Sequence, residues 1–230
     1  MRLVLFDIDG TLLLTGGIGQ CSARASLERV FGTFGQLDQY YPGGRTIEAI
    51  FRDTLADAGI SSTEFKNKRD ALYTAFFEEF KLRLNSGEYS IFPLPGAKEL
   101  VDALNRKQEF LLGLVTGNHQ HTARYKLSAA GFDLDLFKVG AYGDESAHRP
   151  DLVRLAKDRA AEIAGQSFEE FNTVMIGDTT RDVLSAKENG AFSVAVASGT
   201  DSSNLLETVS PDFLFEGLVD VDAIMAAISA

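Results

Sequence analysis

Two aspartates separated by one residue, Asp7 and Asp9, follow directly after a short apolar run near the start of the chain. The run Leu3–Phe6 predicts a buried strand, and Gly10 lets the chain turn sharply where that strand ends. Two carboxylates at such a point suit a cation, or a nucleophile paired with a proton shuttle. Asp-Gly is also a common turn dipeptide, so the interpretation depends on what the rest of the chain brings to the same place.

Polar residues also follow two later apolar runs and precede one predicted helix. They are Thr116, Gly117 and Asn118 after the run 110–115, Asp178 and Asp182 after the run 173–176, and Arg149 before a helix expected from Pro150. Ligands of parallel α/β sheets bind outside the carboxyl ends of the strands. We therefore expect all of these side chains to converge on one rim of a sheet.

The acidic members of this set suit a hard divalent cation. Asp7, Asp178 and Asp182 offer oxygen ligands alone, which fits Mg²⁺, and no His or Cys accompanies them as zinc would require. Taken singly, Asp178 could be a turn former, and Asp182 could serve only the first turn of its helix. Their joint occurrence with Asp7 favours a magnesium site.

The remaining members suit phosphoryl transfer. Thr116 and the amides around Gly117 can hold phosphate oxygens, and Arg149 can neutralise charge on a transferred phosphoryl group. Asp7 is then the nucleophile that attacks phosphorus, while Asp9 protonates the leaving oxygen and later activates water. The structural alternatives are a plain helix cap for Thr116 and a solvated surface cation for Arg149.

The elements that must position these residues alternate between strands and helices. Apolar runs predict strands at 3–6, 110–115, 138–140, 173–176 and 193–197, and amphipathic stretches predict helices at 97–107, 119–130, 150–163, 181–189 and 219–228. This alternation indicates an α/β fold with a doubly wound parallel sheet of Rossmann-like type. Between residues 21 and 86 the apolar stripes are helical throughout. We therefore expect a catalytic core formed by 1–15 and 91–230, interrupted by a helical insert at 16–90.

Composition limits the partners of the chain. It has 230 residues, 45% of them hydrophobic, and a formal net charge of −11. Such an acidic balance argues against nucleic acids and anionic membranes, and no apolar run reaches the length of a membrane span. Cys21 is the only cysteine, so an intrachain disulfide is impossible, and we expect a buried, inert thiol. With no secretory leader at the N-terminus, we expect a cytoplasmic protein.

The whole pattern resembles the haloacid dehalogenase-like (HAD) hydrolase superfamily, in particular its phosphoglycolate phosphatase-like members with a helical C1-type cap. The resembling segments are Asp7-Ile-Asp9-Gly10-Thr11-Leu12, Thr116-Gly117-Asn118, Gly177-Asp178-Thr179-Thr180-Arg181-Asp182 and Leu94-Pro95-Gly96, where the chain re-enters the core. The resemblance implies that Mg²⁺ is held by the side chains of Asp7 and Asp178 and by the backbone carbonyl of Asp9. Many relatives have a lysine in the third motif, where this chain has Arg149, and the two cations are not interchangeable.

The resemblance also implies that the insert 16–90 is a cap that closes over the site and excludes water. Its most polar turn is 41–46, and such a turn usually contacts the leaving group of the substrate. Arg45 is therefore the candidate for binding a second anionic group of the substrate, with a surface ion pair as its structural alternative.

These features together predict a Mg²⁺-dependent phosphomonoesterase that hydrolyses a small soluble phosphorylated metabolite through an aspartyl-phosphate, as a monomer or small homo-oligomer. A sugar-phosphate mutase on the same scaffold is the nearest alternative. A dehalogenase is less favoured, because that chemistry needs neither a proton donor at Asp9 nor a metal. A phospho-receiver-like signalling domain ranks low, because receivers lack a helical insert after the first strand, and a silent binding protein has little support.

Overall fold

A computed structural model describes residues 1–168 and 172–229, and its centre is a parallel β-sheet. The strands of this sheet are β1 (Arg2–Phe6), β4 (Phe110–Thr116), β5 (Val139–Tyr142), β6 (Thr173–Gly177), β7 (Phe192–Val196) and β8 (Phe213–Phe215). Their spatial order is β5-β4-β1-β6-β7-β8, and each neighbouring pair is parallel. The α/β fold with a parallel sheet, predicted from the sequence, is confirmed.

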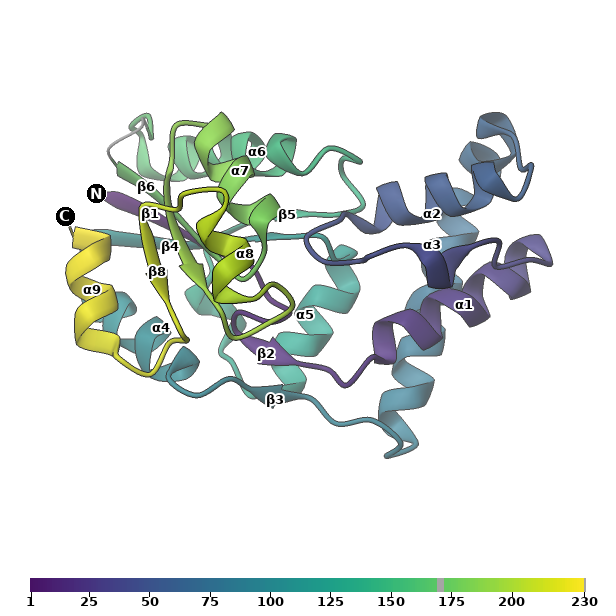
Figure 1. The fold of residues 1–230 in the computed structure, drawn as a ribbon, viewed down its shortest axis with the longest axis horizontal. Coiled ribbons are helices and arrows are strands. Elements are labelled where there is room, and N and C mark those ends of the chain that lie inside the picture. Colours follow the sequence, from purple (N-terminus) through teal and green to yellow (C-terminus); the bar gives the residue numbers. More distant parts are fainter. Residues whose placement is uncertain (169–171, 230) are drawn as a thin grey trace.

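Helices cover both faces of the sheet (Figure 1). They are α4 (Ala97–Asn105), α5 (Gln120–Ala129) and α9 (Val221–Ser229) on one face, α6 (Arg149–Ala164) and α7 (Thr180–Glu188) on the other, and the short α8 (Ser203–Glu207) beside β8. The side chains of β1 alternate between the two faces, as strand geometry requires. Leu3 and Leu5 pack with α6, whereas Val4 and Phe6 pack with α4 and α9. With both faces buried, β1 reads as a continuous apolar run.

A separate group of helices lies between β1 and α4 in the sequence and beside the sheet in space (Figure 1). Its elements are α1 (Ile18–Phe31), the 3₁₀ turn η1 (Leu37–Gln39), α2 (Ile47–Asp57) and α3 (Ser62–Asn85). These helices share a hydrophobic cluster of their own, centred on Phe51, Leu55, Leu72 and Phe76. Such a cluster is what an inserted cap needs in order to hold its shape.

The chain leaves the sheet and returns to it through two paired segments. The strands β2 (Leu13–Leu14) and β3 (Phe92–Pro93) run antiparallel side by side. This pairing supports the division that we propose, a core of 1–15 with 91–230 and a cap of 16–90. Within that core, residues 169–171 and 230 lie outside the described part of the chain.

The structure also differs from the sequence predictions. The short elements β2, β3, α8 and the two 3₁₀ turns, at Leu37–Gln39 and Leu134–Leu136, were not predicted, because a strand of two residues or a helix of three to five residues is too short to show a periodic apolar pattern. The expectation of a buried Cys21 is wrong. Its side chain is exposed, and the Tyr89 hydroxyl contacts its Sγ at 3.1 Å. The buried face of α1 is formed instead by Ile18, Ser22, Ala23, Ser26 and Leu27. Among the described residues, no helix is both long enough and apolar enough to cross a bilayer.

Candidate active site

Three buried aspartates meet at the carboxyl end of the sheet. Asp7 follows β1, Asp178 follows β6, and Asp182 lies in the first turn of α7. One carboxylate oxygen from each lies within 4.8 Å of the others, and all three residues are buried. The parallel order β1-β6 brings the first two together, because neighbouring parallel strands end at the same edge.

This crowding of carboxylates is electrostatically unfavourable without a further cation. Burial raises the pKa of Asp7 to about 7, although the nearby Arg149 guanidinium acts in the opposite direction. Burial and the charge of Asp7 raise the pKa of Asp178 to about 8. A divalent cation would compensate the ionised carboxylates, and oxygen-only ligands suit Mg²⁺. The donor set therefore fits the metal that the sequence predicted.

The backbone at Gly10 and at Gly199 packs so closely against the Asp178 carboxylate that neither position has room for a side chain. The Asp178 carboxylate accepts hydrogen bonds from the backbone N–H of Thr200 at 2.8 Å and from the Thr11 hydroxyl at 3.3 Å. A Cβ atom at Gly199 would lie 1.9 Å from Asp178 Oδ2, and one at Gly10 would lie 2.3 Å from it. Glycine at both positions allows the loops after β1 and β7 to enclose this carboxylate.

Arg149 and Asp182 form a buried ion pair beside Asp7. The guanidinium, at the first residue of α6, donates to Asp182 Oδ1 from Nε at 3.0 Å and from Nη2 at 2.5 Å. The same Nη2 lies 3.1 Å from Asp7 Oδ1. Asp182 Oδ2 accepts from the Thr179 backbone N–H at 3.0 Å and from its hydroxyl at 2.6 Å. The Asp182 backbone N–H donates to Thr179 Oγ1 at 3.3 Å, which completes a capping box on α7. Asp182 is thus engaged by Arg149 and by its own helix, which leaves Asp7 and Asp178 as the better placed metal ligands.

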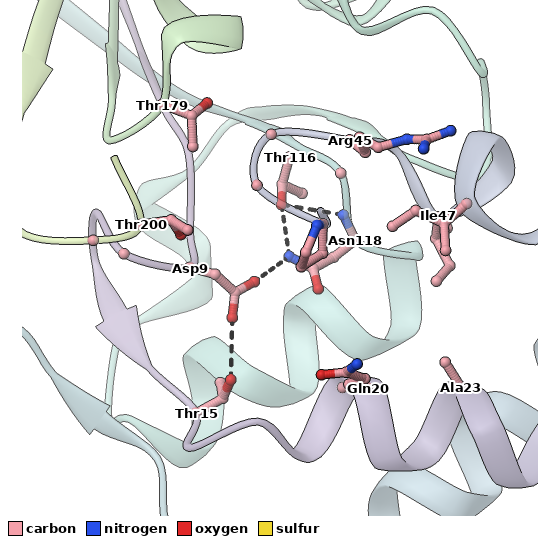
Figure 2. Close-up of a pocket in the computed structure, with 18 of the residues that line it drawn as sticks. Asp9, Thr15, Gln20, Ala23, Arg45, Ile47, Thr116, Asn118, Thr179 and Thr200 are labelled. Carbon is pink, nitrogen blue, oxygen red and sulfur yellow. Dashed lines mark hydrogen bonds between the residues drawn. The ribbon is translucent and has the colours of Figure 1, made fainter. Parts of the chain in front are cut away.

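Asp9 belongs to a second network, whose central residue was missed by the sequence analysis. Lys126 on α5 donates to both carboxylate oxygens of Asp9 at 2.8 Å, and it also donates to Asn118 Oδ1 at 2.6 Å. Asn118 Nδ2 donates to Asp9 Oδ2 at 2.6 Å, and the Thr15 hydroxyl lies 3.4 Å from Oδ1 (Figure 2). The Lys126 side chain is only 4% exposed, whereas that of Asp9 is 39% exposed.

A signal for Lys126 was present in the sequence. Lys126 stands on the apolar stripe of α5 with Ala123 and Leu127, and Ala130 follows directly after the helix; all three apolar residues are buried. Lysine is almost never fully buried unless it is paired, so a lysine on such a stripe predicts an acidic partner. The identity of the partner, 117 residues earlier in the chain, depends on the fold.

Thr116 and Gly117, at the end of β4, contact neighbouring loops. The buried Thr116 hydroxyl accepts from the backbone N–H of Asn118 at 3.3 Å and from its Nδ2 at 2.7 Å (Figure 2). The Gly117 carbonyl accepts from the backbone N–H of Ile47 at 2.8 Å. A Cβ atom at position 117 would lie 2.1 Å from the Arg45 carbonyl, so glycine permits this close contact between the cap and the core.

The Arg45 side chain is the one predicted site group that the structure turns away from the others. Its guanidinium forms an ion pair with Asp53 of α2 and stacks over the Tyr40 ring at 4.8 Å. In Figure 2 it points away from Asp9. The Arg45 backbone carbonyl packs against Gly117 at the rim of the sheet, whereas its guanidinium does not reach the rim.

Most of the predicted site residues line one cavity of about 440 Å³ between the sheet and the helical insert, whereas Asp178 and Asp182 are not among the residues of its wall. Asp7, Asp9, Thr116, Asn118 and Arg149 contribute to its wall from the side of the sheet. Figure 2 shows Asp9, Thr116 and Asn118 on one side, with Gln20, Ala23 and Ile47 facing them from the insert. A space of this size accommodates a small molecule. A buried carboxylate beside an arginine, with a second carboxylate in reach of the same cavity, can perform nucleophilic attack with proton transfer.

Comparison with known proteins identifies relatives along the whole chain. A model of the family described as "haloacid dehalogenase-like hydrolase" matches residues 1–190. The chain is 25% identical to "Pyrophosphatase PpaX" of Oceanobacillus iheyensis, over 98% of this chain and 97% of the relative. It is 30% identical to "Probable phosphatase IndB" of Dickeya dadantii, over 95% of this chain and 91% of the relative. The solved structure of a hydrolase from Pseudomonas syringae has the same fold, with a TM-score of 0.73, 19% identity and full coverage of both chains.

Proposed function

Since this chain belongs to the haloacid dehalogenase-like hydrolase family, we propose that it is a Mg²⁺-dependent phosphomonoesterase acting through an aspartyl-phosphate. Its substrate is a small phosphorylated metabolite. One observation carries this proposal. The buried Asp7 carboxylate lies 3.1 Å from the Arg149 guanidinium, in a cluster with Asp178 and on the same cavity as Asp9.

The first half of the reaction transfers the phosphoryl group to the protein. A carboxylate oxygen of Asp7 forms a bond to phosphorus while the bond from phosphorus to the leaving oxygen breaks. Asp9 gives its proton to that leaving oxygen, so the alcohol departs neutral. Arg149 stabilises negative charge on the phosphoryl oxygens, and Thr116 contributes a buried hydroxyl at the same wall.

The second half returns the protein to its starting state. Asp9 accepts a proton from water, the water oxygen bonds to phosphorus, and the bond between Asp7 and phosphorus breaks to release inorganic phosphate. Asp7 and Asp178, with the Asp9 backbone carbonyl implied by the family resemblance, would hold Mg²⁺, which neutralises charge on the phosphoryl oxygens when bound. The helical insert over the cavity limits the access of bulk water.

A steady-state assay tests this proposal. We expect hydrolysis of p-nitrophenyl phosphate that requires Mg²⁺, stops with EDTA and releases inorganic phosphate. A mutase would not release inorganic phosphate, because it retains the phosphoryl group instead of transferring it to water. The Asp7→Asn variant removes the nucleophile and should lower kcat by about a thousandfold or more. Asp158→Asn, the same change at an exposed position of α6, is the matched control and should retain full activity. Metal-independent activity, or full activity in Asp7→Asn, would contradict the mechanism.

A further inference from the structure

The cavity has two chemically different halves. The half formed by the sheet carries the carboxylates and cations described above. The half formed by the helical insert is lined mainly by neutral side chains, namely Gln20, Ala23, Leu37, Ile47, Ile50 and Phe76. In the proposed reaction the phosphoryl group occupies the charged half, so the remainder of the substrate must lie against the neutral one.

Each cation among the described residues that line the cavity already has an acidic partner. Arg149 is paired with Asp7 and Asp182, and Lys126 with Asp9. These two serve the phosphoryl end of the cavity.

Arg45 is the cation contributed by the insert, and it is neutralised by Asp53. The Arg45 side chain is only 17% exposed, and it is further held by the Tyr40 ring. Asp53 also contacts Arg52 at 3.2 Å, which fixes the carboxylate between two guanidinium groups. Among the described residues that line the cavity, none therefore offers an uncompensated positive charge to the remainder of the substrate.

We propose that the physiological substrate is a phosphate monoester whose alcohol portion is uncharged and partly apolar. This inference rests on the proposed phosphatase function. A second phosphate or carboxylate in the neutral half would lose its hydration without gaining a new ionic partner, which is unfavourable. A neutral alcohol loses little hydration there and gains apolar contact with Ile50 and Phe76. The Gln20 amide, whose Nε2 contacts Asp38 Oδ1 at 3.4 Å, keeps its carbonyl oxygen as an acceptor in the same half. The expectation that Arg45 binds a second anionic group is replaced by this assignment.

Two substrates that differ by one carboxylate test the inference on the Mg²⁺-loaded enzyme. Phenyl phosphate and para-carboxyphenyl phosphate have the same ring and similar leaving groups. We expect kcat/KM to be about tenfold higher for phenyl phosphate. Pyrophosphate, whose leaving group is itself an anion, should also be a poor substrate. Equal or better hydrolysis of the doubly anionic compounds would overturn the inference while leaving the phosphatase function intact.

The Asp53→Asn variant makes the test specific to Arg45. It frees the guanidinium with almost no change in shape, so kcat/KM for para-carboxyphenyl phosphate should rise about fivefold, while the value for phenyl phosphate stays unchanged. Glu78→Gln is the matched control, because Glu78 pairs with Arg29 on the exposed surface of the same insert. An unchanged substrate ratio in Asp53→Asn would refute the inference. Failure of all esters with Mg²⁺ would instead refute the phosphatase function, and the inference with it.

Discussion

The Asp9 side chain illustrates how neighbouring residues can give a carboxylate a defined orientation. Lys126 contacts both of its oxygens, and Asn118 donates to one of them. Because Asp9 is partly exposed, its carboxylate would otherwise sample several rotamers. Lys126 is buried on α5, and besides Asp9 and Asn118 its ammonium contacts the Phe80 ring at 5.6 Å. We therefore consider Lys126 a positioning residue that acts through Asp9.

The Lys126→Met variant tests this role, because methionine keeps the length of the side chain and removes the ammonium. Without it Asp9 loses its orientation, and proton donation to the leaving oxygen should fail. We expect kcat to fall about a hundredfold for ethyl phosphate, which needs that proton. For p-nitrophenyl phosphate, whose leaving group departs without one, the loss should be clearly smaller.

Steady-state kinetics with both substrates measures the difference. Lys66→Met, at an exposed position of α3, controls for the loss of one positive charge. Equal losses for the two substrates would indicate a general structural defect instead of a role in orienting Asp9.

At the scale of elements, the helical insert is fastened to the core at several points. The backbone N–H of Glu48 donates to the Gly143 carbonyl at 3.1 Å, and Arg69 of α3 donates to the Asp144 carbonyl after β5. Arg69 also pairs with Glu48 at 2.8 Å. These contacts hold the insert over the carboxyl end of the sheet, in the position that a closed cap requires (Figure 1).

Loss of the Arg69 contacts should favour the open position of the insert. In Arg69→Met we expect kcat/KM to fall about fivefold, since a partly exposed charged hydrogen bond contributes about 1 kcal/mol. Faster hydrogen exchange at the cap–core contact, near Glu48 and Asp144, should accompany this loss. Arg29→Met removes an arginine–glutamate pair that lies within the insert, and is the matched control. Equal effects of the two variants would show that the link from Arg69 to the core does not hold the cap.

For the molecule as a whole, we expect the carboxylate cluster to make the free energy of unfolding depend on pH and, at the proposed metal site, on Mg²⁺. In the metal-free protein, burial raises the pKa values of Asp7 and Asp178 to about 7 and about 8. In the unfolded chain both groups titrate near pH ~4. Between pH ~4 and about pH 8 the native state binds more protons than the unfolded state, so the free energy of unfolding falls as pH rises through this range.

Thermal unfolding should show both effects. The metal-free protein is expected to have a higher Tm at about pH 6 than at about pH 8. Mg²⁺ at a hundredfold excess over its Kd should raise Tm by about 5–10 °C, and more so at the higher pH, where the carboxylates are ionised. Asp178→Asn should have a flatter pH dependence and a smaller response to Mg²⁺. A wild-type Tm insensitive to Mg²⁺ would argue against a metal site at this cluster.

The sequence by itself determined the sheet and the rim at which Asp7, Asp178 and Thr116 meet. Strands buried on both faces are continuous apolar runs, and the carboxyl ends of parallel strands lie at one edge, so local sequence predicts where the residues after them converge. The family followed from the same residues and is confirmed. The catalytic and metal-binding roles of the individual residues stay predictions.

Only the tertiary structure decided which partner each charged side chain has. Arg45 is committed to Asp53, Asp182 to Arg149, and Lys126 to Asp9. The last two pairs join segments far apart in the chain, and all three depend on rotamers and on the approach of whole elements. A charged residue in the sequence therefore indicates which chemistry is possible. Its partner in the folded structure decides whether that charge is available to bind a substrate. For this protein that difference is why we propose a neutral cap side of the cavity, in place of the anion site expected from Arg45.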